Sequence, residues 1–200
     1  MSTTLIINGA QPGPISAGQL NARFAAEAAG RLAGRGHRIL ETAAAGAWDI
    51  EEEIAKHVAA DTIILQFPVH WMGAPWGLKR YMDEVHTLAM DGRLANGDGR
   101  SRHDPSAQYG SGGTATDTRY MFSVTFNAPA AAFDDPDQYL FGGRSLEDLL
   151  FPVHMGMRFM GMTALPSFAA YDVVKNPTIE DDLARFRAHL DAAVDRRAAA

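Results

Sequence analysis

The sequence predicts a doubly wound α/β fold, with five parallel strands in the order 2-1-3-4-5 and helices on both faces of the sheet. Short apolar, β-branched runs alternate with longer segments of helical periodicity along the chain. The run at residues 63–65 is continuously apolar, which is typical of a strand buried on both faces. Five predicted strands occur along the chain, and that number favours the order 2-1-3-4-5.

We expect strands at residues 3–8, 38–41, 62–67, 120–125 and 164–170, and helices at residues 18–32, 50–60, 75–85, 146–160 and 178–197. The first helix has apolar residues at every fourth position, and glycines follow it as plausible stops. The second has Asp49 as a candidate N-cap and three glutamates in its first turn, where the helix dipole favours them. Pro75 suits the first turn of the third helix.

The second half of the chain is less regular. Residues 86–118 are aperiodic and rich in glycine, and loops of this length are usually functional or disordered. We expect an interruption near Pro152 in the fourth helix, because proline removes a helical hydrogen bond. The last helix is amphipathic, and we expect residues 1–200 to form one domain.

Composition argues against several classes of protein. The formal charge is −6 and no cluster of Lys and Arg provides the basic face that nucleic acids require. The absence of cysteine excludes disulfides, zinc–thiolate sites and Fe–S clusters, and it fits a cytoplasmic location. No apolar run approaches the roughly 20 residues of a membrane span, and the N-terminus lacks signal-peptide features. The seven histidines show no metal-ligand spacing, so no metal is expected.

The loop after the first strand is a candidate phosphate site. It opens a helix through Ser16-Ala-Gly-Gln-Leu-Asn21. Ser16 and Gln19 can donate to phosphate oxygens, Gly18 allows close approach of the backbone, and the helix dipole attracts anions. The alternative is that Ser16 is simply the N-cap of the helix. Neither a GxGxxG nor a GxxxxGK[ST] pattern is present.

The loop after the third strand reads QFPVHWMGAPW at residues 66–76. Ligands of open α/β sheets lie at the carboxyl ends of the strands, and an aromatic loop stiffened by proline suits a flat ring, with a flavin as the best candidate. The alternative is that Trp71 and Trp76 are core aromatics. His70 is either a polar pocket residue or a surface histidine.

Two further segments are candidates for the same site. Asn127 and neighbouring amides follow the fourth strand, where donors would stabilise the negative charge of a reduced flavin; a simple turn is the alternative. Tyr109 lies among glycines and would cover a ring or pocket, unless it belongs to a flexible turn. Three aspartates at 134, 135 and 137 fit solvated turn charges better than a metal site.

These segments together resemble one family. The matching pieces, in chain order, are LIINGA (5–10), GQLN (18–21), QFPVHWMGAPW (66–76), DGR (91–93), DPSAQYGSGG (104–113), FNAP (126–129), DQYLFGG (137–143), FMGM (159–162), LPSF (165–168) and YDVVKNP (171–177). They cover nearly the whole chain. The chain resembles the bacterial NAD(P)H:quinone oxidoreductases of the modulator of drug activity B type, which have a flavodoxin-like fold.

The resemblance implies FAD as the cofactor, NADPH as the electron donor, quinones as substrates and a homodimer. Family contacts to FAD map onto Ser16, Gly18, Gln19, Leu20, Asn21, Arg23, Pro68, Val69, His70, Trp71, Met72, Tyr109, Thr125, Phe126, Asn127 and Ala128. Two departures stand out. The family's His-Ser-Asn run before GQLN is here Ile15-Ser16-Ala17, and its Gly-Trp-Trp is here Val69-His70-Trp71.

We expect a two-electron ping-pong reaction in which NADPH gives a hydride to the flavin, leaves, and is replaced by the quinone that receives it. No side chain is an obligatory acid or base, although Tyr109 or His70 would serve as a proton donor. The alternatives are an FMN-dependent reductase of azo or nitro compounds, a non-enzymatic electron carrier, and a fold that has lost its cofactor.

Overall fold

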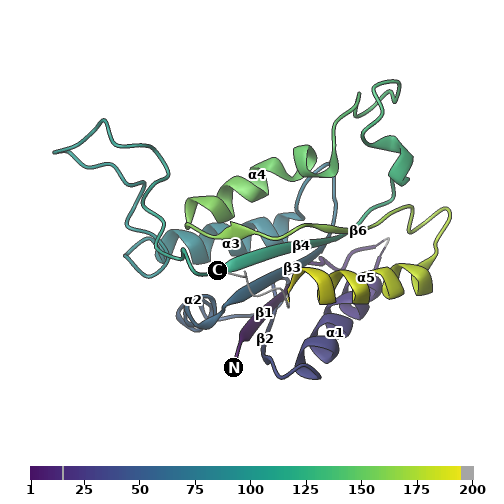
Figure 1. Ribbon diagram of the computed structural model, residues 1–200, viewed down its shortest axis with the longest axis horizontal. Helices are drawn as coiled ribbons and strands as arrows, with labels where there is room; N and C mark the ends of the chain where they lie inside the picture. The colour runs from purple at the N-terminus through teal and green to yellow at the C-terminus, as the bar shows by residue number, and fades with distance from the viewer. Residues whose placement is uncertain (15, 195–200) are drawn as a thin grey trace.

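A six-stranded parallel sheet forms the centre of the computed structural model, which describes residues 1–14 and 16–194 (Figure 1). Its strands run in the order β2-β1-β3-β4-β5, and β6 also pairs with β4. The predicted order is therefore confirmed. The strands are β1 (Thr3–Asn8), β2 (Arg38–Ala43), β3 (Thr62–Pro68), β4 (Arg119–Thr125), β5 (Thr163–Ala164) and β6 (Phe168–Ala170).

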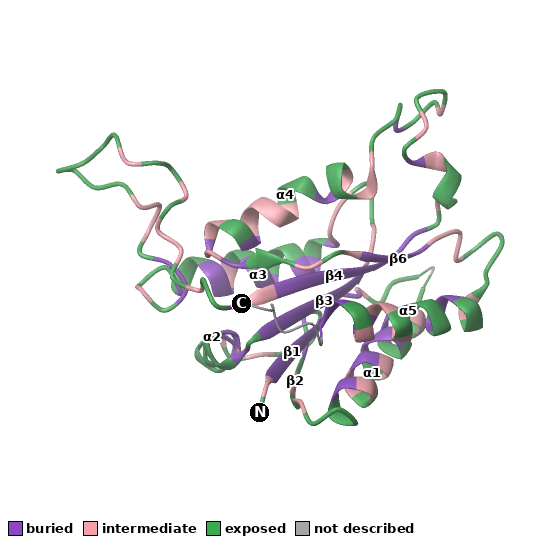
Figure 2. Ribbon diagram, viewed as in Figure 1, coloured by how far each residue is buried: buried purple, intermediate pink, exposed green. Residues whose placement is uncertain are grey.

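Within the described residues, five helices cover the two faces of the sheet. They are α1 (Gln19–Ala33), α2 (Ile50–Ala59), α3 (Trp76–Leu88), α4 (Leu146–Phe159) and α5 (Ile179–Ala193), and a short 3₁₀ helix spans Ala130–Ala132. Helices α1 and α5 pack on one face, over Ile6 and Ile64. Helices α2, α3 and α4 pack on the other, over Leu5 and Ile63. Neighbouring residues of one strand thus point to opposite faces, so β1 and β3 are buried on both (Figure 2).

Two predicted elements differ in detail. The strand expected at 164–170 is two short strands, β5 and β6, with Pro166 between them, because proline has no N–H for the ladder. The expected interruption of the fourth helix was wrong: α4 continues through Pro152. A capping box between Ser145 and Asp148 fixes the start of this helix. Of the predicted last helix, residues 195–197 lie outside the described part.

Asp49 is the N-cap of α2, as predicted, and its carboxylate accepts the backbone N–H of Glu52 at 3.0 Å. Within the described residues, no helix combines the length and the apolar character needed to cross a membrane.

A buried polar cluster joins β2, α2 and α3 behind the sheet. The Glu53 carboxylate accepts hydrogen bonds from Thr42 and Tyr81, each at 2.7 Å, and from Lys56 at 2.8 Å. Burial alone would raise the pKa of Glu53, but these hydrogen bonds bring it below its ordinary value. Next to the cluster, the buried rings of His57 and His86 lie edge to face, with centroids 5.5 Å apart.

Burial lowers the pKa of both histidines, and that of His86 falls to about 3. The unfolded chain therefore takes up protons near pH 6.5 that the folded chain does not, so stability decreases as pH falls from about 6.5 toward 3. At pH 5, the shifted pKa of His86 lowers the free energy of unfolding by about 2 kcal/mol relative to neutral pH. We predict that His86→Met flattens the pH dependence of the free energy of unfolding, measured by urea titration between pH 7.5 and 5.

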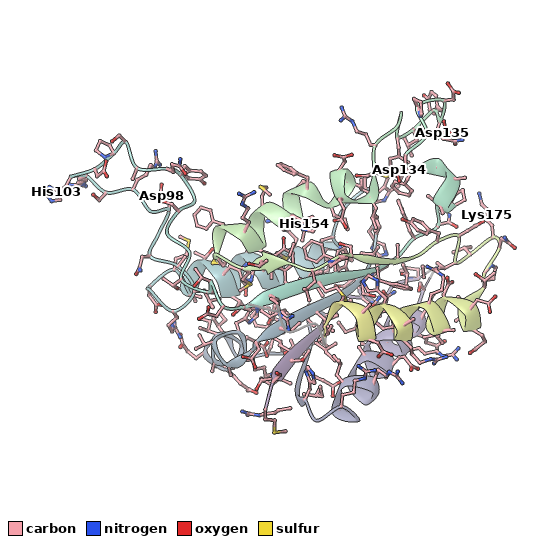
Figure 3. All side chains as sticks on the ribbon, in the orientation of Figure 1. Asp98, His103, Asp134, Asp135, His154 and Lys175 are labelled. Carbon is pink, nitrogen blue, oxygen red and sulfur yellow. The ribbon has the colours of Figure 1, made fainter. Side chains whose placement is uncertain are left out.

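The matched control is His103→Asn, because His103 is exposed on a projecting loop (Figure 3). This change leaves the slope of the pH dependence as in the wild type. A slope that is the same in H86M as in the wild type would contradict the assignment of His86 as a buried neutral imidazole.

Candidate functional site

The loops that follow β1, β3, β4 and β6 are joined edge to edge at the carboxyl ends of the strands. Gly9 N donates to the carbonyl of Gln66 at 2.8 Å, Val69 N donates to that of Thr125 at 3.0 Å, and Phe126 N donates to that of Ala170 at 2.8 Å. The backbone ladder thus continues one residue beyond each strand. The segments that begin at Gly9, Val69 and Phe126 therefore start side by side on one rim of the sheet.

Side chains below the rim fix the same arrangement. Asn21 of α1 donates from Nδ2 to Thr125 Oγ1 at 3.1 Å and accepts at Oδ1 from Gln66 Nε2 at 2.8 Å. All three side chains are buried. The amide of Asn21 therefore ties α1 to β3 and β4, and the buried side chains of Asn21 and Thr125 hold the rim together.

The loop after β1 also packs against the first turn of α3. A Cβ at Gly9 would lie 2.6 Å from Leu78 Cδ2, and one at Gly77 would lie 2.2 Å from Gln11 Oε1. At Gly9 the added Cβ would also lie 3.0 Å from Leu78 Cβ, so a larger residue would force the loop away from the helix, whereas at Gly77 it would displace the end of the flexible Gln11 side chain. The buried Oε1 atom of Gln11 has no hydrogen-bond partner among the described residues. The close contact brings the candidate phosphate loop beside the aromatic loop.

The start of α1 is open. Its N-cap is Gly18, with φ of 75°, and within the described part of the chain no side chain caps it and no acidic residue lies in its first turn. The alternative of Ser16 as N-cap was wrong; Ser16 Oγ instead accepts Gly18 N at 3.3 Å. The first N–H groups of α1 are thus available to an anion, which is the property that phosphate sites at helix N-termini use.

A strained hairpin turn presents the aromatic loop. His70 and Gly73 exchange two backbone hydrogen bonds, of 2.9 and 3.1 Å, around Trp71 and Met72. These two residues have φ of 45° and 66°, the left-handed values of a type I′ turn, which normally selects Asn-Gly. Each such non-glycine residue costs about 1 kcal/mol or more, and strain of this kind is typical of functional sites.

The indole of Trp71 is almost entirely uncovered, with 98% of the residue exposed, and Trp76 is 67% exposed. The alternative of two core tryptophans was therefore wrong. His70 is exposed at the base of the turn, and Met72 is 42% exposed. A fully exposed tryptophan on a strained turn leaves one broad apolar surface at the rim without a partner from the described part of its own chain.

The remaining predicted residues differ in their exposure and contacts. Ser16, Gln19 and Asn127 are exposed on the rim, while Pro68, Val69, Leu20 and Ala128 are half-buried beside it. Phe126 is buried against Phe133 and Phe141, where it anchors the segment that carries Asn127. The guanidinium of Arg23 is paired with Glu180 at 2.7 Å.

Tyr109 is not brought to the rim of its own chain. It belongs to a long arm that leaves the end of α3, at the opposite end of the molecule from the loop with Asp134 and Asp135 (Figures 1 and 3). It is 72% exposed, and its ring lies 5.7 Å from that of Phe159 and 5.3 Å from the guanidinium of Arg100.

A groove that the sequence analysis missed runs between the Trp71–Met72 turn and Tyr109. It has a volume of about 580 Å³, lies between α3 and α4, and is lined by Met72 and Ala74 at one end and by Tyr109 at the other. Its signal in the sequence is the spacing of four between Met82, His86 and Met90, which places them on one face of α3 and the turn after it.

A family model described as "Flavodoxin-like fold" matches residues 2–194 of the chain. Over 187 residues, the chain is 42% identical to protein C5H10.05c of Schizosaccharomyces pombe, covering 94% of each chain. It is 37% identical to the NADPH:quinone oxidoreductase MdaB of Haemophilus influenzae, covering 94% of this chain and 96% of that relative.

Among solved structures, a putative quinone reductase from Klebsiella pneumoniae superposes with a TM-score of 0.76. It is 24% identical and covers 96% of this chain and 85% of its own, a likeness that supports the fold alone. The family match and the MdaB relative confirm the resemblance found in the sequence. The chain belongs to the flavodoxin-like fold family, as a relative of the MdaB-type quinone reductases.

Proposed function

We propose that the chain is a flavin-dependent NAD(P)H:quinone oxidoreductase that uses FAD and NADPH. The observation that carries the proposal is the uncovered indole of Trp71, on a strained turn, beside the uncapped start of α1. A flavin nucleotide needs both features, a flat surface for its ring and an anion site for its phosphates. The name of the Haemophilus influenzae relative, 37% identical over nearly its whole length, supports the reaction.

The residues present fit such a cofactor. Ser16, Gln19 and the first N–H groups of α1 would hold phosphates, and the close approach of Gly18 would let them reach the backbone. Trp71, the amides of the turn and Asn127 would hold the ring. The two departures from the family leave these elements in place; Ile15, the first of the altered residues, lies outside the described part of the chain.

Bound FAD would supply the redox chemistry: NADPH, a quinone and one proton would become NADP⁺ and the quinol, with the two substrates taking turns at one face of the ring. The protein's own part is to position the flat substrates by stacking and to exclude water from beside them. His70 is exposed at the base of the turn and is our candidate for the donor of the proton.

A homodimer is part of the proposal. Tyr109 lies at the far end of the groove from the turn, so a contact of Tyr109 with flavin, as the family resemblance implies, would be made to the flavin of a second copy. The exposed arm that carries Tyr109 extends from the body of the subunit, as an element that reaches a partner would (Figure 1). The cytoplasmic location expected from the sequence stays a prediction.

We predict that Trp71→Gly weakens flavin binding without lowering stability. Glycine removes about 1 kcal/mol of left-handed strain, and this gain offsets its larger entropy in the unfolded chain. The thermal midpoint of the flavin-free protein should therefore not fall. Loss of the indole should raise the dissociation constant of FAD about tenfold, since one stacked aromatic pair contributes roughly 1.4 kcal/mol.

The matched variant is Met72→Gly, which relieves the neighbouring residue of the same turn but keeps the indole. It should match the stability of W71G and bind FAD more tightly than W71G does. Midpoints come from calorimetry and affinities from flavin fluorescence. Equal FAD affinity in W71G and wild type would show that Trp71 does not contact the ring.

The proposed reaction is tested by releasing the bound flavin and measuring its mass, and then following NADPH oxidation with menadione. We expect FAD, and many turnovers with one quinol formed per NADPH. If the released flavin has the mass of FMN, the cofactor in the proposal is FMN instead of FAD. A single turnover without added reductase would identify an electron carrier, and a protein that stays colourless with added FAD would reject flavin chemistry altogether.

A further inference from the structure

A second cavity lies between α4 and β5, on the other flank of α4 from the groove. Its volume is about 530 Å³, and Met155 is the only residue that lines both. We call it the α4–β5 cavity. It is distant from the rim, because Tyr120 and Thr163, which also line it, lie at the amino ends of β4 and β5. Its helical wall is one stripe of α4, formed by Glu147, Phe151, His154, Met155 and Arg158.

A chain of hydrogen bonds fixes the floor of this cavity, where His154 lies between α4 and the sheet (Figure 3). The hydroxyl of Tyr120 is 2.8 Å from His154 Nδ1, and His154 Nε2 is 2.6 Å from Glu147 Oε2. Burial raises the pKa of Tyr120 to about 12, so the hydroxyl keeps its proton and donates it to Nδ1. The imidazole then donates through Nε2 to Glu147, whose same oxygen accepts Ser167 Oγ at 3.1 Å.

Arg158 supplies an unpaired charge in this cavity. It lies in the last turn of α4, and its guanidinium has no hydrogen bond or ion pair among the described residues. The two acidic residues of the cavity are engaged, Glu147 by the chain of hydrogen bonds and Asp148 by its capping box with Ser145. The end of a helix favours a cation, but that interaction leaves the N–H donors of the guanidinium open, and their planar fork matches a carboxylate.

The wall beside this cation is apolar. Phe151 is 57% exposed and lies two helical turns before Arg158 on the same face of α4. Met155, Met162 and Ala164 continue the apolar surface. A ring placed against these side chains would be removed from water while an acid group on the ring reaches the guanidinium.

We propose that the α4–β5 cavity binds a small aromatic monocarboxylate, with the carboxylate on Arg158 and the ring against Phe151 and Met155. The volume of about 530 Å³ is that of a site for a small organic molecule. Glu147 and Asp148 lie at the other end of the stripe, roughly 15 Å from Arg158 along the helix axis, so they would repel a second negative charge on the ligand. The site is separate from the flavin rim, and the proposal does not depend on the proposed reductase function.

The probe is 2-naphthoate, titrated calorimetrically into the purified protein. We expect binding to wild type, and a dissociation constant about tenfold higher or more in Arg158→Gln, because the charge-assisted hydrogen bonds are lost. The control is Arg38→Gln. Arg38 is also exposed and without a side-chain partner in the described part of the chain, but it lies on β2, at the opposite edge of the sheet. This variant should bind 2-naphthoate as wild type does.

Two analogues test the chemical class of the ligand. The neutral 2-naphthalenemethanol lacks the charge that pairs with Arg158, and 2,6-naphthalenedicarboxylate brings a second charge toward Glu147 and Asp148. Each should bind wild type about tenfold more weakly than 2-naphthoate. A dicarboxylate that binds as tightly as 2-naphthoate would overturn the assignment of a monocarboxylate site.

A second pair of variants decides the question if R158Q fails to fold. Ala164 is exposed on β5 and lines the cavity, so Ala164→Glu places a negative charge there and Ala164→Gln is its neutral match. We expect A164E to lose 2-naphthoate binding and A164Q to retain it. Absence of binding to wild type, or wild-type affinity in A164E, would overturn the proposal.

The flavin rim is the other place where a flat ring could bind, and W71G separates the two sites. The proposal requires that 2-naphthoate binding survives in W71G and is lost in R158Q. Binding that is lost in W71G and kept in R158Q would place the ligand at the rim and overturn the proposal. Quinone reduction is not measured in these titrations, so the proposed function is tested separately.

Discussion

The site depends on one buried amide. Asn21 joins α1 to β3 and β4 through Gln66 and Thr125, so the N-terminus of the first helix and two strand ends keep a fixed relation. A buried amide is costly when its partners are missing, so the two hydrogen bonds of Asn21 favour a single arrangement, although the buried Oε1 atom of Gln66 has no partner among the described residues. Each loop that we assign to the flavin begins directly beyond this bridge, and its position follows from it.

Above the bridge, the chain keeps features that a structure selected for stability alone would not retain. Trp71 and Met72 hold left-handed backbone conformations, and the indole is exposed to solvent. Strain and uncovered apolar surface both cost free energy, and they occur here together at the rim where ligands of this fold class bind. The same turn forms the mouth of the groove between α3 and α4, so one short segment connects the ring site with the groove.

The sequence predicted the rim well because the carboxyl ends of neighbouring parallel strands must meet. Strand order and the loops at Ser16, Trp71 and Asn127 follow from hydrophobic periodicity and from that rule. The structural role of Asn21 could not be predicted in the same way. In the sequence, a polar residue beside a glycine-containing loop fits a ligand contact as well as it fits a buried hydrogen bond between a helix and two strands. The position of Tyr109 could not be predicted either. It lies in a segment without helical or strand periodicity, and such a segment does not indicate where in the fold it will lie.

The sequence by itself determined the fold class, the order of the strands and the family, because these follow from the local spacing of apolar residues and from motifs in series. Only the tertiary structure decided which side chains at the rim are buried and which are exposed. Burial turned Asn21 and Thr125 inward, the I′ turn pushed Trp71 outward, and the packing of α4 on α3 created the groove. Each of these depends on contacts between segments far apart in the chain, which local patterns do not encode.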